Sequence, residues 1–220
     1  KLDLGNNEFI NYEFHENSGK PIIVFSNSLG SDLNMWSPQV DFFKNDYQLV
    51  LYDKRGHGKS SPALGPYTFD MLENDVVSIM DDLNIAKAHF VGLSMGGMTS
   101  LGLALKHSDR FNKMVCCAAR ADMPPPAIES WDQRMAVVED KGTEGVVEGS
   151  LERWFSDEFR NNSSNSDVIN KAGEMIKSTS VNGYIGSCNA IKGLDYLREL
   201  GKIKKDFLFV SGENDVGAPA

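Results

Sequence analysis

The chain has 220 residues, enough to bury the hydrophobic core of one domain and to leave room for an insertion. Its 31 acidic and 22 basic residues give a net charge of -9, and no basic run could follow a phosphate backbone, which argues against a nucleic-acid partner. No apolar run approaches membrane-spanning length, so we expect no membrane partner.

Residues 1–15 alternate like a pair of strands and lack the apolar core of a signal peptide. The chain has three cysteines, two of them adjacent at Cys116 and Cys117, which form neither a disulfide framework nor a Cys-x-x-Cys metal pair. We expect them to be small buried hydrophobic residues in a reducing compartment. These features together predict a cytoplasmic protein without a metal site.

Short apolar runs rich in β-branched and aromatic residues predict buried strands along the chain. They lie at 21–26, 47–53, 88–93, 113–118 and 206–212. Helical periodicity between them is clearest over 68–83, behind Thr68 as a candidate N-cap. Strand and helix alternate in this way through residue 118, which predicts an α/β fold with a mostly parallel sheet flanked by helices.

The prolines of "MPPPA" at 123–127 mark a change of pattern. Amphipathic helices are then predicted at 127–140, 143–155, 166–178 and 182–192, with a polar loop at 160–166. We therefore predict a core over 1–122, a helical cap inserted at 123–192, and a continuation of the core over 193–220.

The stretch "VGLSMGG" at 91–97 places one serine among three glycines, where a strand ends and a helix begins. Gly92-x-Ser94-x-Gly96 matches the nucleophile elbow, a turn so tight that its serine takes a strained backbone conformation. Glycine is expected on both sides because a Cβ atom there would meet neighbouring backbone. Ser94 is therefore the candidate nucleophile, and the amide of Met95 is a candidate donor for the oxyanion hole.

Acyl transfer also needs a second oxyanion donor and an acid. The loop 27–30 follows an earlier strand, and its Leu29 amide is our candidate for the donor. Asp215 comes just beyond the last predicted strand and is our candidate for the acid; Glu213 is its nearest rival and lies closer to the strand end.

The general base should be a histidine that follows the acid. The chain has four histidines: His15, His57, His89 and His107. None follows Asp215, and His57 is interpreted as part of a structural turn between glycines. We expect the base to come from a segment after Ala220 or from elsewhere, and the 220 residues alone to be a poor catalyst.

The motifs "SNSLGSDLNMW", "YDKRGHGKS", "VGLSMGGM" and "GENDVGAP" resemble those of the α/β-hydrolase superfamily. More narrowly, "GLSMGGMTSLGLALKHSDRF", "ESWDQRM" and "LERWF" are similar to the 3-oxoadipate enol-lactonases of bacterial aromatic degradation. This resemblance runs over nearly the whole chain. It implies that Ser94 attacks the ring carbonyl of a small anionic enol-lactone, and that water releases 3-oxoadipate from the acyl-enzyme without metal or organic cofactor.

A substrate with a carboxylate would need a cationic side chain to orient it. Arg134 is the first candidate, with Trp131 and Trp154 as apolar walls; Arg120 and Arg153 are weaker alternatives. The competing interpretation makes Arg134 a solvated helix arginine and the tryptophans part of the cap core.

Two other classes of function stay open. The same fold could serve a general esterase, a carbon–carbon bond hydrolase or a cofactor-free haloperoxidase, or it could bind a ligand without catalysis. An exposed sheet edge and an uncovered apolar face are also predicted, and both are compatible with a homo-oligomer.

Overall fold

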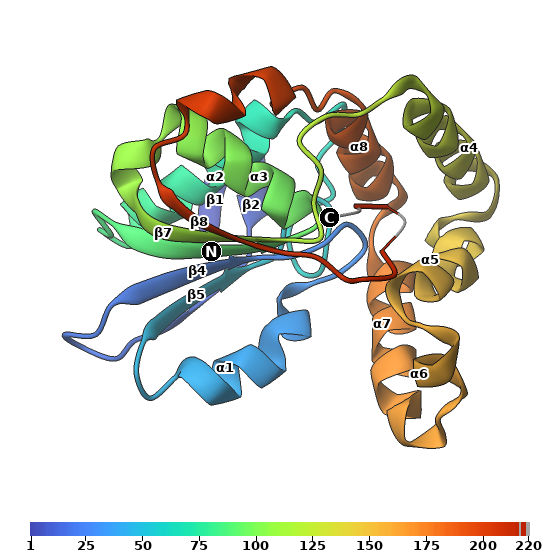
Figure 1. The fold of residues 1–220 in the computed structure, drawn as a ribbon, viewed down its shortest axis with the longest axis horizontal. Helices are drawn as coiled ribbons and strands as arrows, with labels where there is room; N and C mark the ends of the chain where they lie inside the picture. The colour runs from blue at the N-terminus through green and yellow to red at the C-terminus, as the bar shows by residue number, and fades with distance from the viewer. Residues whose placement is uncertain (216, 219–220) are drawn as a thin grey trace.

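The computed structural model describes residues 1–215 and 217–218. Its centre is a sheet of six strands in the order β3-β5-β4-β6-β7-β8, in which β3 is antiparallel to β5 and the other neighbours are parallel (Figure 1). The strands are β3 (Tyr12–His15), β4 (Ile22–Ser26), β5 (Gln48–Tyr52), β6 (Ala88–Leu93), β7 (Phe111–Cys117) and β8 (Asp206–Val210). A hairpin of β1 (Leu2–Gly5) and β2 (Glu8–Ile10) precedes them. The predicted α/β class is confirmed.

Helices cover both faces of this sheet, which is why its central strands are mostly apolar. Helix α1 (Ser37–Phe43) packs on one face, and α2 (Phe69–Asp82) and α3 (Met95–Lys106) pack on the other (Figure 1). Helix α2 begins where predicted, because the Thr68 hydroxyl accepts a hydrogen bond of 3.2 Å from the Met71 amide.

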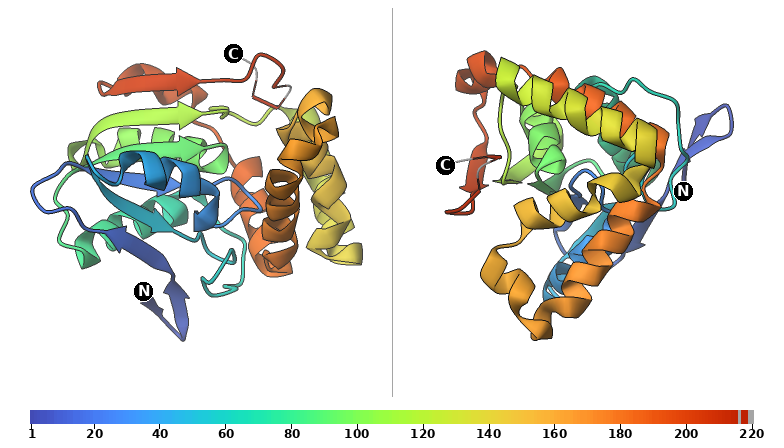
Figure 2. Two further views of the ribbon diagram at one scale, coloured as in Figure 1. Left: turned by 90° about the horizontal axis from the view of Figure 1, so that it is seen from below. Right: turned by 90° about the vertical axis from the view of Figure 1, so that its right-hand side faces the viewer.

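Five further helices follow one another within the predicted cap. They are α4 (Pro125–Lys141), α5 (Val147–Trp154), α6 (Asp157–Asn161), α7 (Ser166–Ser178) and α8 (Val181–Lys192). They gather beside the end of the sheet towards which β7 and β8 point (Figure 2). The polar loop predicted at 160–166 was wrong, since α6 and the 3₁₀ turn η4 (Ser163–Asn165) occupy much of it. The helices thus lie over the carboxyl edge of the parallel strands.

Strand β8 is the outermost strand of the described sheet on one side. Its side chains Leu208, Phe209 and Val210 are 59%, 62% and 47% exposed, so the expected open edge and apolar face are confirmed for the described residues. Among those residues no helix is long and apolar enough to cross a membrane. The three cysteines are free, and Cys116 and Cys188 are buried as expected, whereas Cys117 is half-buried.

Candidate active site

Ser94 stands between β6 and α3 with φ 53° and ψ −112°, in the positive-φ region that a serine rarely adopts. Its amide donates a hydrogen bond of 2.8 Å to the Cys117 carbonyl at the end of β7. A Cβ atom on Gly92 would lie 2.1 Å from the Gly96 carbonyl oxygen, and one on Gly96 would lie 2.1 Å from the Ser26 carbonyl oxygen. The strained turn and its two obligatory glycines are therefore as predicted.

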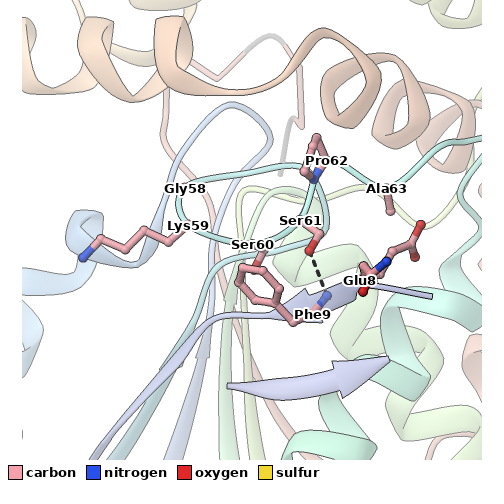
Figure 3. Close-up of a pocket in the computed structure, with 9 residues that line it drawn as sticks. Glu8, Phe9, Gly58, Lys59, Ser60, Ser61, Pro62 and Ala63 are labelled. Carbon is pink, nitrogen blue, oxygen red and sulfur yellow. Dashed lines mark hydrogen bonds between the residues drawn. The ribbon is translucent and has the colours of Figure 1, made fainter. Parts of the chain in front are cut away.

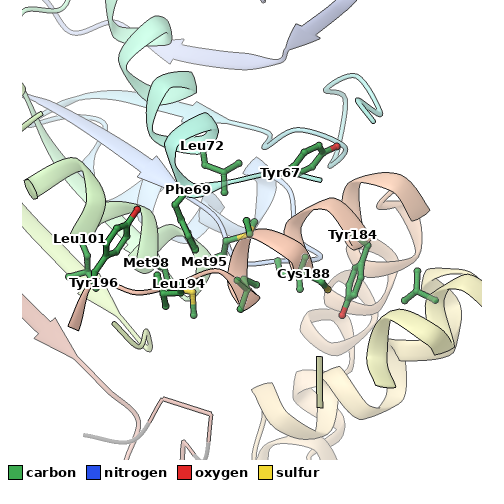
Figure 4. Close-up of a cluster of buried hydrophobic side chains, with 14 of the residues drawn as sticks. Tyr67, Phe69, Leu72, Met95, Met98, Leu101, Tyr184, Cys188, Leu194 and Tyr196 are labelled. Carbon is green, nitrogen blue, oxygen red and sulfur yellow. The ribbon is translucent and has the colours of Figure 1, made fainter. Parts of the chain in front are cut away.

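The loop 27–30 continues from the end of β4 and is wholly buried. The Gly96 amide donates to the Asn27 carbonyl over 3.1 Å, which ties the beginning of this loop to the beginning of α3. Met95 is fully buried, and its side chain packs in an apolar cluster shared with α2 and α8 (Figure 4). The two candidate oxyanion donors, Leu29 and Met95, thus belong to segments that are directly bonded to each other.

His57 holds the other end of the same loop. The Gly30 amide donates to its Nε2 over 3.1 Å, and its Nδ1 donates to the Arg55 carbonyl over 2.8 Å. Complete burial lowers the pKa of His57 to about 4, with a further lowering by the Lys54 charge, so the ring is neutral. Both ring nitrogens are occupied, which confirms the interpretation of His57 as structural.

The other three histidines lie away from Ser94. His15 is on β3, which is separated from β6 by β5 and β4, or about 14 Å at ordinary strand spacing. His89 precedes Ser94 by five residues on β6, about 16 Å along a strand. His107 caps the far end of α3, about 18 Å along the helix. That the general base is none of these four histidines stays a prediction.

Asp215 follows β8, which lies two strands from the strand that ends at Ser94. Its Oδ1 accepts hydrogen bonds from the amides of Gly217 (2.8 Å) and Ala218 (3.0 Å), and the residue is half-buried. Glu213, its rival, is exposed. Its place at the carboxyl edge of the sheet suits a triad acid, and this role stays a prediction.

Arg134 of α4 and Arg153 of α5 both act electrostatically on the phenol of Tyr184 in α8. The guanidinium carbon of Arg134 lies 4.1 Å from the ring centroid of Trp131. Desolvation and then the charge of Arg134 lower the pKa of Arg153, while burial raises the pKa of the Tyr184 phenol against the opposing charges of both arginines. Within the described residues, neither Arg134 nor Arg153 forms an ion pair with a carboxylate.

The other cap candidates differ from this pair. Arg120 is paired with Asp122 over 3.6 Å, and Trp154 ends α5 with 38% of its surface exposed. Trp131, in contrast, is half-buried and packs against the cluster of Figure 4. The sequence carries no local signal that relates Arg153 to Arg134, because the two residues lie on different helices.

A surface cavity of about 410 Å³ lies elsewhere, between the N-terminal hairpin and the loop 58–63 (Figure 3). The Ser61 hydroxyl within it accepts a hydrogen bond of 2.8 Å from the Phe9 amide and so is occupied structurally. No described group of three or more histidine, cysteine, aspartate or glutamate side chains could hold a metal ion.

A parallel sheet that presents a strained serine between a strand and a helix is the arrangement of an α/β hydrolase. The sequence agrees, since the family model described as alpha/beta hydrolase fold matches residues 21–219. The chain belongs to this family.

Two curated relatives are 3-oxoadipate enol-lactonases 1 and 2 of Acinetobacter baylyi, at 38% and 33% identity. The matches cover 89% and 94% of this chain and 71% and 76% of those proteins. The solved enol-lactonase of Burkholderia xenovorans is similar with a TM-score of 0.91 and 36% identity, over 97% of this chain and 82% of that one. RutD of Caulobacter segnis, provisionally named a carbamate hydrolase, is 35% identical over 66% of this chain and 56% of its own length.

Proposed function

We propose that this protein is a serine hydrolase that cleaves the ester bond of a small anionic lactone. The favoured substrate is 3-oxoadipate enol-lactone, and the product 3-oxoadipate would belong to the bacterial breakdown of aromatic compounds. The observation that carries the hydrolase proposal is the strained backbone of Ser94 at the carboxyl edge of the sheet. Similarity to proteins named enol-lactonases, at 33% and 38% identity, supports the lactone.

In this mechanism Ser94 Oγ attacks the ring carbonyl while a base takes its proton. The amides of Leu29 and Met95 stabilise the resulting oxyanion. The bond between the carbonyl carbon and the ring oxygen then breaks, and the ring oxygen leaves as an enol that becomes the ketone. Water releases the second carboxylate from Ser94. We propose Asp215 as the acid that orients the base, and a histidine beyond residue 220 as the base.

The substrate carboxylate is assigned to Arg134 and Arg153. Neither guanidinium group has a carboxylate partner among the described residues; burial, and after it the charge of Arg134, lower the pKa of Arg153. An anionic ligand would offset these positive charges and accept charge-assisted hydrogen bonds from both. Trp131 beside Arg134 would provide an apolar wall for the ring.

The test compares 3-oxoadipate enol-lactone with α-angelica lactone, an enol-lactone of the same ring without the carboxylate. The protein is made from its complete reading frame, and ring opening is followed by ultraviolet absorbance. Ser94→Ala should lower kcat for both lactones by about a thousandfold or more. Arg134→Met should raise KM about tenfold to a hundredfold for the anionic lactone and leave the neutral lactone unchanged.

Arg198→Met, on an exposed turn, is the matched control and should change neither lactone. Full turnover by Ser94→Ala would contradict the hydrolase mechanism. Equal turnover of both lactones, with no effect of Arg134→Met, would favour a general esterase. Binding of the lactone without turnover would favour a ligand-binding protein.

A further inference from the structure

A lysine is buried directly behind the candidate oxyanion hole. Lys54, two residues beyond the end of β5, is 1% exposed. Its Nζ donates hydrogen bonds to the Ser26 hydroxyl over 2.8 Å and to the Asn27 carbonyl over 2.5 Å. Burial lowers its pKa to about 7, against the opposing charges of Asp53 and Asp75. Lysine is almost never fully buried unless paired, and burying an ammonium group is costly, so its position needs an explanation.

The Asn27 carbonyl is the junction between three segments. It accepts one hydrogen bond from Lys54 and one of 3.1 Å from the amide of Gly96, at the beginning of α3. Asn27 begins the loop 27–30, and the Gly30 amide at its end is bonded to His57. Lys54 and His57 belong to one segment, 54–57, so this segment holds both ends of the loop that carries Leu29.

We propose that Lys54 is a positioning residue of the oxyanion hole, which sets the Leu29 amide relative to the Met95 amide by holding the Asn27 carbonyl. The inference depends on the proposed function, because it gives the loop its catalytic role. Lys54 acts through the loop and does not touch the reacting atoms. His57 holds the other end of the loop 27–30 through its hydrogen bond from the Gly30 amide.

The contacts around the Lys54 ammonium group hold it in one position. The Ser26 hydroxyl that it contacts is also bonded to the Tyr52 hydroxyl at 2.7 Å, and Nζ lies 5.4 Å from the Tyr52 ring centroid. Ser26 itself is the residue whose carbonyl oxygen excludes a Cβ atom at Gly96. Lys54 therefore contacts Ser26 and Asn27, the two residues at the end of β4 that lie against Gly96 of the elbow. A small shift of this junction would move one oxyanion donor relative to the other, and donor geometry controls transition-state stabilisation.

The experiment compares p-nitrophenyl acetate with O-(4-nitrophenyl) thionoacetate, whose thiocarbonyl sulfur accepts hydrogen bonds weakly. An oxyanion hole therefore favours the oxygen ester over the thiono ester. Lys54→Met should lower kcat for the oxygen ester about tenfold or more with KM unchanged, and leave the thiono ester little changed. The ratio of the two kcat values falls accordingly, and this ratio does not depend on how much of the protein is folded.

Lys59→Met, an exposed lysine in the following turn, is the matched control and should keep the wild-type ratio. His57→Gln, at the other end of the loop, should lower the ratio as Lys54→Met does. An unchanged ratio in Lys54→Met, together with loss of turnover in Ser94→Ala, would overturn the role of Lys54 and leave the hydrolase intact. Turnover that persists in Ser94→Ala would instead overturn the proposed function.

Discussion

Backbone atoms, not flexible side chains, prevent a larger residue at Gly92 and at Gly96, two positions before and after Ser94. A Cβ atom on Gly96 would lie 2.1 Å from the Ser26 carbonyl oxygen and 2.6 Å from its carbonyl carbon. Relief of such a contact requires β4 or α3 to move, and both are fixed within the sheet and the core. The motif could be predicted from sequence because its residues are adjacent in the chain, although the contact that excludes a Cβ atom at Gly96 comes from Ser26, far away in sequence.

We expect Gly96→Ala to lower the free energy of unfolding by about 3 kcal/mol, the upper part of the range for overpacking a core. Urea unfolding followed by circular dichroism measures this. Gly201→Ala makes the same change at an exposed position where a Cβ atom would meet nothing within 4 Å, and should alter stability by no more than about 0.5 kcal/mol. Equal stability of the two variants would show that the elbow is not tightly packed.

Other residues of the site carry no local signal. Lys54 lies in a motif that resembles the family, yet its contacts with Ser26 and Asn27 come from the pairing of β4 with β5. The electrostatic influence of Arg134 on Arg153 likewise depends on the tertiary fold, because the two residues belong to different helices, α4 and α5. Both could be recognised only after the elements had been placed relative to one another.

At the scale of secondary structure, predictions held where a pattern was long and failed where it was short. The predicted ends of the main strands agree with the structure to within two residues. Helix α6 has only five residues, and the polar composition around it concealed it. Its beginning does carry a signal, since the Ser156 hydroxyl accepts from the Phe159 amide and two acidic residues follow Ser156.

The turn after β5 should give the protein a specific sensitivity to acid. His57 is neutral in the folded protein with a pKa of about 4, against 6.5 for an ordinary histidine. Between these values the unfolded chain binds a proton that the folded one does not, so stability is complete above pH 6.5 and falls as the pH drops towards 4. The difference of the two pKa values corresponds to about 3 kcal/mol.

Urea unfolding at several values between pH 7 and pH 4 tests this expectation. We expect His57→Gln to be less stable than wild type at pH 7, and this difference in the free energy of unfolding to shrink by about 3 kcal/mol as the pH falls to 4. His15→Gln replaces a partly exposed histidine outside this turn, on β3, and is the control. A constant difference between wild type and His57→Gln would mean that His57 becomes protonated without penalty.

At the scale of the whole molecule, the predicted cap is joined to the core through contacts between residues far apart in sequence. The Ser180 amide and hydroxyl both donate to the Gly56 carbonyl, over 3.0 and 2.9 Å, and Gly56 packs directly on Gly183 of α8. Gly56 belongs to the segment 54–57 that holds the loop 27–30. The same short segment therefore relates the cap to the candidate oxyanion hole. The helices were predictable from the periodicity of the sequence, but this connection was not, since it joins residues more than a hundred positions apart.

A second connection lies where the chain returns from α8 to the core. The Tyr196 amide donates to the Ala121 carbonyl over 2.7 Å, and the Tyr196 hydroxyl donates to the buried Glu73 carboxylate over 2.5 Å. Glu73 is 1% exposed and also accepts from Lys106 at 3.0 Å. Burial raises the pKa of Glu73, and the bonds from Tyr196 and Lys106 oppose this rise.

We expect Tyr196→Phe to destabilise the protein by about 1.5 to 3 kcal/mol, because it leaves a buried carboxylate short of a donor. Tyr12→Phe removes an equivalent bond, of 2.6 Å to Asp82, but at an exposed site, where the loss should stay below about 0.5 kcal/mol. The double variant Tyr196→Phe/Glu73→Gln should lose less free energy of unfolding than the two single variants lose together, and the difference should be at least about 0.5 kcal/mol. Urea unfolding of the four proteins of this cycle measures the coupling. Strict additivity, or equal losses of stability in Tyr196→Phe and Tyr12→Phe, would mean that the buried hydrogen bond between Tyr196 and Glu73 does not stabilise the contact of this segment with the core.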